Sequence, residues 1–177
     1  DALPIFAERC LANYYRKHDP FEHGKTVGAE LMVTYPLDPD RDFHLQGYID
    51  RLVDLGGGHY EIHDYKTSRR LPSQADVDRD RQLALYQLAV TQRLPDVRSV
   101  KLVWHYLAHD RRLVSTRTPD QLRELRAEAL ALIETIEAAT AQGNFPPNVG
   151  VLCDWCEFKP MCPAHVPVSD PAVSASR

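Results

Sequence analysis

The chain has 177 residues, 44% of them hydrophobic, which is enough for one domain with a sizeable core and short for two. Its formal net charge is −4, which argues mildly against a protein that binds nucleic acid through overall basicity. The sequence has no run of eighteen apolar residues and no secretory pattern at its start, so we expect an intracellular protein, of cytoplasmic bacterial type, with no membrane partner. It also lacks an initiator methionine, and we expect a fragment that is truncated at its N-terminus.

The first part of the chain predicts one helix and three strands. Apolar residues at helical spacing indicate a helix over 4–18, which Pro20 and Gly24 end. Three segments rich in β-favouring residues follow, separated by two turn signals, Asp38-Pro39-Asp40 and Gly56-Gly57-Gly58. These strands are predicted over 30–37, 43–55 and 59–67. Their short connections favour an antiparallel meander.

The rest of the chain alternates helices with strands. A helix is predicted over 76–93, strands over 100–108 and 113–116, and a long helix from Pro119 to about 141. This order favours an α/β (α+β) fold with a central mixed β-sheet flanked by helices. We expect one domain over 1–165, including a cysteine-cluster segment over 146–165, and a flexible tail over 166–177.

Three charged side chains lie close together on two neighbouring predicted strands. Asp64 and Lys66 point to the same face because side chains alternate along a strand, and an antiparallel neighbour brings Asp50 roughly opposite them. Such charges are costly to bury unless something binds there. They can hold Mg²⁺ or Mn²⁺ and act on a phosphodiester, with Lys66 orienting or deprotonating the attacking water. The alternative is structural: Asp50 pairs with Arg51, while the other two charges are solvated at the surface.

Further polar residues can join this cluster. Gln82 and Tyr86 are four residues apart on the helix that follows, so they share a face that can look over the site. The alternatives are an exposed helix residue for Gln82 and a core aromatic for Tyr86. Glu30 opens the first strand and can reach the same cluster, or it is a surface acid at a strand end.

Three of the four cysteines are bunched near the C-terminus, at a spacing typical of a metal or iron–sulfur site. Cys153, Cys156 and Cys162 can supply three thiolates to a [4Fe–4S] cluster, which takes four. Cys10 is the remaining cysteine, but its apolar neighbours at helical spacing favour a buried structural thiol. A Zn²⁺ site with His165 as the fourth ligand is the chemical alternative.

Four motifs occur in an order that resembles the PD-(D/E)xK nuclease superfamily, and more narrowly its RecB-type exonuclease group with C-terminal iron–sulfur cysteines. The resemblance extends from about Glu30 to Cys162. It implies a restriction-endonuclease-like core that cleaves DNA with a divalent metal, often from the end of a single strand. The motifs are Gly47-x-x-Asp50, Asp64-x-Lys66-Thr67, Gln82-x-x-x-Tyr86 and Cys153-x-x-Cys156-x₅-Cys162.

The resemblance also implies a role for each residue. Asp50 and Asp64 would ligate the catalytic Mg²⁺ or Mn²⁺, helped by the backbone carbonyl of Tyr65. Lys66 would be the catalytic lysine, and the Gln-x-x-x-Tyr pair would position DNA near the site. Glu30 matches a glutamate found ahead of the core in many members. The iron–sulfur cluster would pin the C-terminal segment in place.

The sequence departs from the family pattern in two places. It shows no upstream helix with a metal-ligating histidine, and no cluster cysteine ahead of such a helix. His18 and His23 lie between the first helix and the first strand, and we interpret both as surface loop histidines. Both absences are typical of a chain that starts late, and one expectation is that such a fragment is inactive as it stands.

Three hypotheses about the function remain. The first hypothesis is a Mg²⁺/Mn²⁺-dependent deoxyribonuclease, an exonuclease of DNA repair, recombination or related processing. Its partner would be DNA that is single-stranded or has a free end, within a larger repair complex. The alternatives are a non-catalytic nucleic-acid-binding or scaffold module of a larger repair protein, and a zinc-binding regulator in which the acidic cluster is incidental.

Overall fold

The computed structural model describes residues 2–21 and 23–165, and the flexible tail predicted over 166–177 lies outside these residues. The chain forms two compact units, Asp1–Leu132 and Ile133–Arg177. Within the described ranges, no helix is long and apolar enough to cross a membrane.

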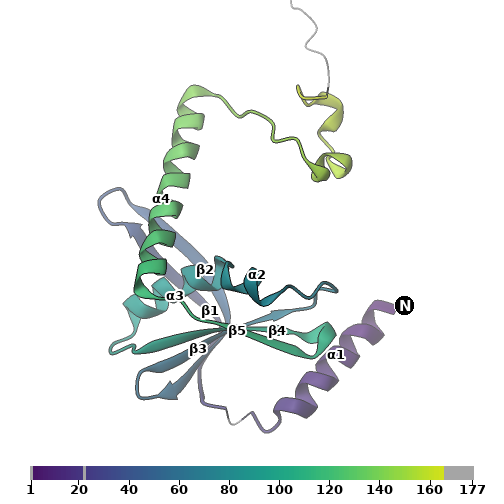
Figure 1. The fold of residues 1–177 in the computed structure, drawn as a ribbon, viewed down its shortest axis with the longest axis vertical. Coiled ribbons are helices and arrows are strands. Elements are labelled where there is room, and N and C mark those ends of the chain that lie inside the picture. The colour runs from purple at the N-terminus through teal and green to yellow at the C-terminus, as the bar shows by residue number, and fades with distance from the viewer. Residues whose placement is uncertain (1, 22, 166–177) are drawn as a thin grey trace, which may run out of the picture. The chain divides into compact units, whose positions relative to one another are not determined.

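A five-stranded mixed sheet forms the centre of the first unit (Figure 1). The strands lie side by side in chain order, with β1, β2 and β3 antiparallel, β3 and β4 parallel, and β4 and β5 antiparallel. The predicted meander and mixed sheet are therefore confirmed. The strands are β1 Lys25–Asp38, β2 Phe43–Gly56, β3 His59–Lys66, β4 Ser99–Tyr106 and β5 Arg111–Ser115.

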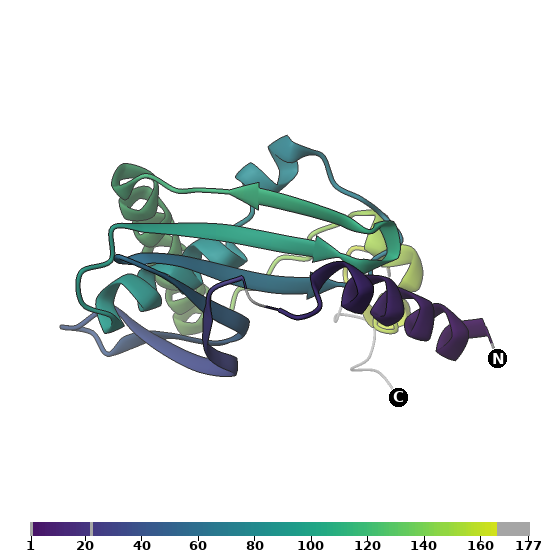
Figure 2. The ribbon, with the colours of Figure 1, turned by 90° about the horizontal axis from the view of Figure 1, so that it is seen from below.

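Helices lie on both sides of this sheet. In Figure 1, α2 (Gln74–Asp78) and α3 (Gln82–Arg93) lie above the strands, whereas α1 (Ala2–His18) lies below them. Figure 2 gives the view from the α1 side. The long helix α4 (Pro119–Gln142) starts in the first unit, where Leu122 joins the core. We call the side of the sheet that faces α3 the front and the side that faces α1 the rear.

The hydrophobic core lies between the sheet and α3. Alternate residues of the central strands, among them Leu52, Ile62, Leu102 and Trp104, are at most 2% exposed and pack in one cluster with Leu83 of α3. Burying a side chain of this size contributes about 1.5–3 kcal/mol. Because side chains alternate along a strand, residues two positions away from these core residues point to the same, front face of the sheet.

Several strand boundaries differ from the sequence-based prediction, and β5 begins at Arg111, two residues earlier than predicted. β1 begins at Lys25, five residues earlier than predicted, because 25–29 pairs with 51–54 of β2. This segment mixes the β-favouring Thr26 and Val27 with residues that strands disfavour, so pairing with the partner strand decides its conformation. β4 ends at Tyr106, because the 3₁₀ turn η1 (Leu107–His109) leads into Asp110, whose φ is +47°.

The prediction of one continuous helix over 76–93 is wrong, because the chain breaks between α2 and α3. Ser73 caps the start of α2. At the start of α3, the Asp80 carboxylate accepts a hydrogen bond of 3.0 Å from the backbone N–H of Gln82. Arg117 donates to the backbone carbonyls of Val77 and Asp80, each at 2.9 Å. A distant arginine thus satisfies the backbone groups that a continuous helix would have paired internally.

The second unit contains the remainder of α4 and the cysteine-cluster segment. This segment has two 3₁₀ turns, η2 (Val151–Trp155) and η3 (Lys159–Met161). Cys153, Cys156 and Cys162 are free cysteines. Trp155 and Phe158 are exposed, at 88% and 69%.

Candidate active site

Asp50 and Asp64 meet where β2 and β3 separate on the front of the sheet. Arg51 pairs with His63 at the end of the β2–β3 ladder, and extending this register by one residue places Asp50 opposite Asp64. The backbone N–H of Tyr65 donates a hydrogen bond of 2.8 Å to Asp50 Oδ2. Arg51 instead donates to Thr26 Oγ1 at 3.0 Å, so the structural alternative of an Asp50–Arg51 pair does not occur. The structure therefore brings the two carboxylates together.

Asp64 is a buried carboxylate with one incompletely satisfied oxygen. It is 5% exposed, and burial raises its pKa although Lys66 partly opposes that effect. Lys66 Nζ donates to Oδ1 at 3.0 Å and lies 2.9 Å from Oδ2 without hydrogen-bond geometry. Within the described structure, Oδ2 is buried without a hydrogen-bond donor. Apart from the nearby charge of Lys66, this oxygen has no partner among the described residues, and Asp50 and Asp64 together offer carboxylate oxygens of the kind that a divalent metal ion takes.

Lys66 connects the acidic pair to α3. Its Nζ donates to Gln82 Oε1 at 3.3 Å, and Gln82 Nε2 donates to the Tyr86 hydroxyl at 3.4 Å. Burial of Lys66 favours the neutral amine, but the hydrogen bond and charge of Asp64 outweigh burial and raise the Lys66 pKa. Lys66 is therefore a cation held between Asp64 and Gln82. The face shared by Gln82 and Tyr86 lies over the site, as their spacing predicts.

Gly47 has a steric role beneath Tyr86. A Cβ atom at Gly47 would lie 2.4 Å from Cε1 and 2.9 Å from the hydroxyl oxygen of Tyr86. Such distances are far inside van der Waals contact, so only glycine lets the tyrosine ring approach the strand this closely. The spacing Gly47-x-x-Asp50 thus combines an open surface for the ring with a carboxylate three residues further along β2.

Glu30 lies near the pair in register but does not bond to it. The flanking pairs Ala29–Arg51 and Leu31–Ile49 place Glu30 opposite Asp50. Its φ is +47° and its side chain is exposed. Within residues 2–21 and 23–165, the Glu30 carboxylate makes no hydrogen bond or ion pair. The structure therefore places Glu30 beside the site without bringing it into the cluster.

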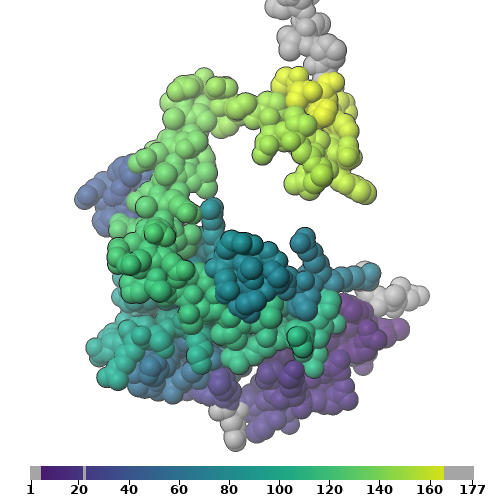
Figure 3. Space-filling model, in the orientation of Figure 1, coloured from purple at the N-terminus to yellow at the C-terminus, as the bar shows by residue number. Residues whose placement is uncertain are grey.

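An open groove of about 420 Å³ begins at Lys66. Tyr106 lies at its base, 8% exposed and in register with Lys66 on the neighbouring strand β4. Tyr106 is not apparent from the sequence alone, because only the parallel pairing of β3 with β4 brings it there. Figure 3 shows α2 and the loop before it standing out from the surface beside this region. The groove is lined by Lys66, Ser68, Arg70, Pro72, Asp76 and Tyr106.

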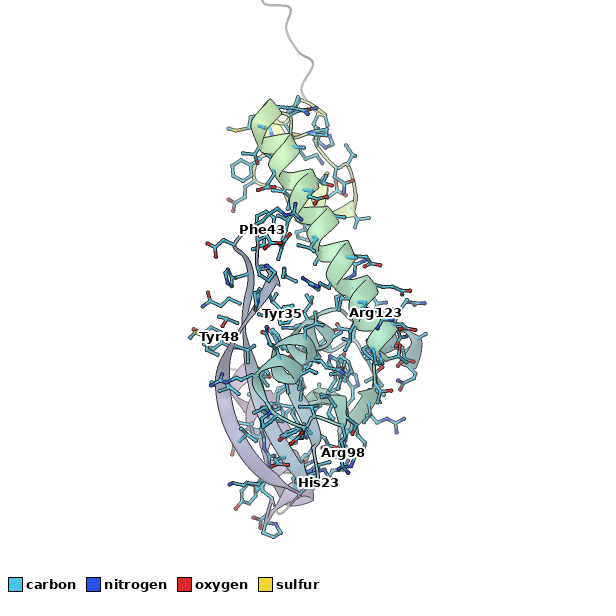
Figure 4. All side chains as sticks on the ribbon, turned by 90° about the vertical axis from the view of Figure 1, so that its left-hand side faces the viewer. His23, Tyr35, Phe43, Tyr48, Arg98 and Arg123 are labelled. Atoms are coloured by element: carbon cyan, nitrogen blue, oxygen red, sulfur yellow. The ribbon has the colours of Figure 1, made fainter. Side chains whose placement is uncertain are left out.

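The rear side of the sheet carries a second polar cluster, which we call the rear network: Glu61, His63 and His105, with His23 at its edge. Glu61 Oε2 accepts hydrogen bonds from His23 Nε2 at 2.9 Å and His63 Nε2 at 3.1 Å, and Oε1 accepts one from Arg112 at 3.0 Å. His23 lies at the opposite end of the β1–β2 hairpin from Phe43 (Figure 4). His23 lies in an exposed loop, as interpreted from the sequence, and its ring also binds the buried Glu61 carboxylate.

Hydrogen bonding sets the protonation of the rear network. His63 Nε2 must donate to the carboxylate, so its Nδ1 accepts the 2.8 Å bond from His105 Nε2. Burial, followed by nearby positive charges, lowers the pKa of His105 to about 3. Burial would raise the pKa of Glu61, but the bonds from His63 and His23 outweigh it and lower that pKa to about 2. At neutral pH the network is therefore a buried carboxylate facing the neutral imidazoles of His63 and His105.

The rear network touches the active strand through Tyr65. The Tyr65 ring stacks on His105 with ring centroids 5.0 Å apart, and its hydroxyl lies 3.0 Å from that of Tyr14 on α1. His18, at the end of α1, has its ring centroid 5.6 Å from that of His105. His18 is thus a helix residue packed on the rear network, which corrects its assignment to a surface loop.

The cysteines divide between the two units. Cys10 is 5% exposed on α1, which agrees with the prediction of a buried thiol. The other three lie in the second unit. Across the described parts of the chain, no group of three or more His, Cys, Asp or Glu residues is arranged to hold a metal ion.

The sequence matches the family model described as the PD-(D/E)XK nuclease superfamily over residues 2–163. The match starts well before Glu30 and so includes α1. No curated protein matches the chain. The mixed sheet with flanking helices is consistent with the restriction-endonuclease-like fold of that family. Because the match covers nearly the whole chain, this protein belongs to the PD-(D/E)XK nuclease superfamily.

Proposed function

We propose that this domain is a metal-dependent nuclease that hydrolyses phosphodiester bonds in DNA. The observation that carries the proposal is the buried Asp64 carboxylate, whose Oδ2 lacks a hydrogen-bond donor beside Asp50 and Lys66. Membership of a nuclease superfamily supports it, and nucleases of this superfamily typically use divalent metals such as Mg²⁺. A scaffold role would not require a buried acid to remain without a donor.

Asp50, Asp64 and the backbone carbonyl of Tyr65 would hold Mg²⁺ or Mn²⁺. Such an ion supplies positive charge that polarises a phosphate and favours ionisation of a water molecule. Lys66, whose raised pKa keeps it charged, would stabilise the negative charge that develops on the phosphate. This protonation state favours a role as a charged donor over removal of a proton from water.

Gln82 and Tyr86 would position the DNA strand. Gln82 already orients Lys66, and the groove that begins at Lys66 adds the guanidinium of Arg70. A cationic groove of this kind suits a phosphate backbone although the chain is acidic overall. Glu30, exposed beside Asp50, would contact the strand or a second cation. The motif order favours a RecB-type exonuclease acting on single-stranded or free-ended DNA, within a larger repair or recombination complex.

The cysteine-cluster segment at 146–165 would belong to the same domain, over 1–165. Three free cysteines, Cys153, Cys156 and Cys162, support a [4Fe–4S] cluster completed by a thiolate from elsewhere. Burial of Cys10 in α1 makes it a weak candidate for that ligand. Iron and sulfide analysis of anaerobically purified protein distinguishes this cluster from a Zn²⁺ site with His165.

The nuclease proposal is tested by degradation of end-labelled single-stranded DNA. We expect cleavage with Mg²⁺ or Mn²⁺, none with excess chelator, and recovery when metal is restored. Asp64→Asn should abolish cleavage, because the amide places a neutral oxygen or an N–H where the proposed metal needs a charged ligand. Loss of activity with retained thermal stability supports the proposal. Absence of cleavage by the wild-type protein, under every metal condition, would contradict it.

Gly47→Ala should lower the cleavage rate through Tyr86. The new Cβ displaces the Tyr86 ring and breaks its bond with Gln82, at a cost of about 1–3 kcal/mol in stability. Gly28→Ala on β1 is a matched control, because its Cβ would lie 3.4 Å from the Leu31 side chain, an ordinary contact. The rates and melting temperatures of both variants are compared with wild type. Equal activity of the two variants would rule out this role for Gly47.

A further inference from the structure

A cavity of about 190 Å³ opens on the rear side of the sheet, next to α1. His63 faces it while Asp64, the next residue, faces the front, since side chains alternate along β3. The cavity is therefore separated from the proposed nuclease centre by the sheet itself. Its polar lining includes Tyr14, His18, His23, Arg51, His105 and Arg112.

Two arginines from different strands meet at this cavity. Arg51, on β2, donates from Nε to Thr26 Oγ1, and Arg112, on β5, donates to Glu61. A guanidinium has several N–H donors in a planar fork, so both side chains retain donors beyond these bonds. Guanidinium groups that lie close together and have spare N–H donors typically bind the oxygens of a phosphate group.

The charge balance of the cavity is positive. Among the described residues, two carboxylates influence the pKa values of its imidazoles, and each is already paired: Glu61 with Arg112 and two histidines, and Asp110 with Lys17 at 3.0 Å. Arg51 remains without a carboxylate partner within residues 2–21 and 23–165. Burial, followed by the charges of Lys17 and Arg112, lowers the pKa of His18. This surplus occurs in a chain whose net charge is −4, so it is a local feature of the rear side.

We propose that this cavity binds a phosphate group, supplied either as free inorganic phosphate or as the terminal phosphate monoester of a nucleotide strand. Its volume lies below the roughly 300 Å³ at which pockets for whole small molecules begin, so it suits one charged group better than a complete nucleotide. The His18 ring adds a donor around the two guanidinium groups, as does the Tyr14 hydroxyl when Tyr65 donates to it. This inference goes beyond the proposed nuclease function and does not depend on it.

Calorimetric titration of inorganic phosphate into the protein tests the proposal. The protein is kept in chelator at pH 7 and constant ionic strength, so that no divalent metal contributes. We expect saturable binding at one site and an affinity about 10- to 100-fold lower in Arg51→Gln, which loses a charged donor set. Arg123→Gln is the matched control, because Arg123 is an exposed α4 residue paired with Asp120, and it should bind phosphate like wild type.

A second arm distinguishes the source of the phosphate. A 5′-phosphorylated dinucleotide that binds more tightly than inorganic phosphate indicates a strand terminus, and equal affinities indicate that free phosphate suffices. The unphosphorylated dinucleotide should not compete. Thermal denaturation of Arg51→Gln confirms that the variant is folded. Absence of saturable binding by wild type, or unchanged binding by folded Arg51→Gln, would overturn the proposal.

Discussion

Lys66→Met should lower kcat for metal-dependent DNA cleavage by about 10²- to 10³-fold. Methionine keeps the apolar stem of lysine but removes the cation that lies between Asp64 and Gln82. If that cation acts on charge that develops during the reaction, the loss falls on kcat rather than on KM. Single-turnover cleavage of end-labelled single-stranded DNA, with Mn²⁺ and enzyme in excess, measures the chemical step directly.

Lys25→Met is the matched control for this variant. Lys25 is exposed at the start of β1, so its replacement changes the net charge equally without touching the site. We expect cleavage at the wild-type rate in Lys25→Met. A similar loss in both variants would mean that overall charge, rather than the position of Lys66, governs the rate. Wild-type kcat in Lys66→Met would refute the assignment of the lysine.

Glu61→Gln should destabilise the fold by about 3–5 kcal/mol at pH 7. Glu61 is 1% exposed and accepts bonds from His23, His63 and Arg112. The amide replaces a carboxylate acceptor with a group that also presents N–H donors, so the Arg112 guanidinium, whose side chain is 40% exposed, loses its counter-charge. Urea unfolding at pH 7 measures the difference. Glu128→Gln removes an exposed pair with Arg81 and should change stability by at most about 1 kcal/mol.

The pH dependence of the free energy of unfolding, compared between wild type and Glu61→Gln, provides a second readout. Folding lowers the pKa of Glu61 from 4.5 to about 2, so its ionisation stabilises the fold above pH 4.5 and that stabilisation is lost as the pH falls through 2. A shift of this size corresponds to roughly 3 kcal/mol. The deficit of Glu61→Gln relative to wild type should therefore shrink between pH 4.5 and 2. A deficit that stays constant over this range would contradict the ionised state of Glu61.

His105 adds an earlier loss of stability on acidification. Its pKa is lowered from 6.5 to about 3 in the fold, so the unfolded chain binds more protons between these values. Stability due to this histidine is complete above pH 6.5 and declines as the pH falls towards 3. The wild-type curve should therefore begin to fall near pH 6.5, before Glu61 contributes.

Much of the candidate site follows from local periodicity. The two-residue repeat of a strand puts Asp64 and Lys66 on one face, and a tight glycine turn brings Asp50 back beside them. The four-residue spacing of Gln82 and Tyr86 likewise fixes their common face on α3. The structure agrees with these expectations because each concerns residues joined by one element or one short turn.

Other features depend on residues that are distant in the sequence. The break before Gln82 is stabilised by Arg117, which follows β5, so helical periodicity over 76–93 could not reveal it. The rear network joins His23 to Glu61 and His63 to His105, across separations of 38 and 42 residues. A lone histidine carries no local pattern that distinguishes a loop residue from a buried partner.

The sequence by itself determined the class of fold, the chain order of the strands and the front-face carboxylates with their lysine, because these follow from short-range alternation and turn chemistry. Only the tertiary structure decided that Asp64 is buried with an oxygen lacking a donor, that Tyr106 lies beside Lys66, and that histidines from three segments gather around Glu61. The physical reason is that burial and charge pairing depend on strand neighbours and packing across the sheet, which local sequence does not encode.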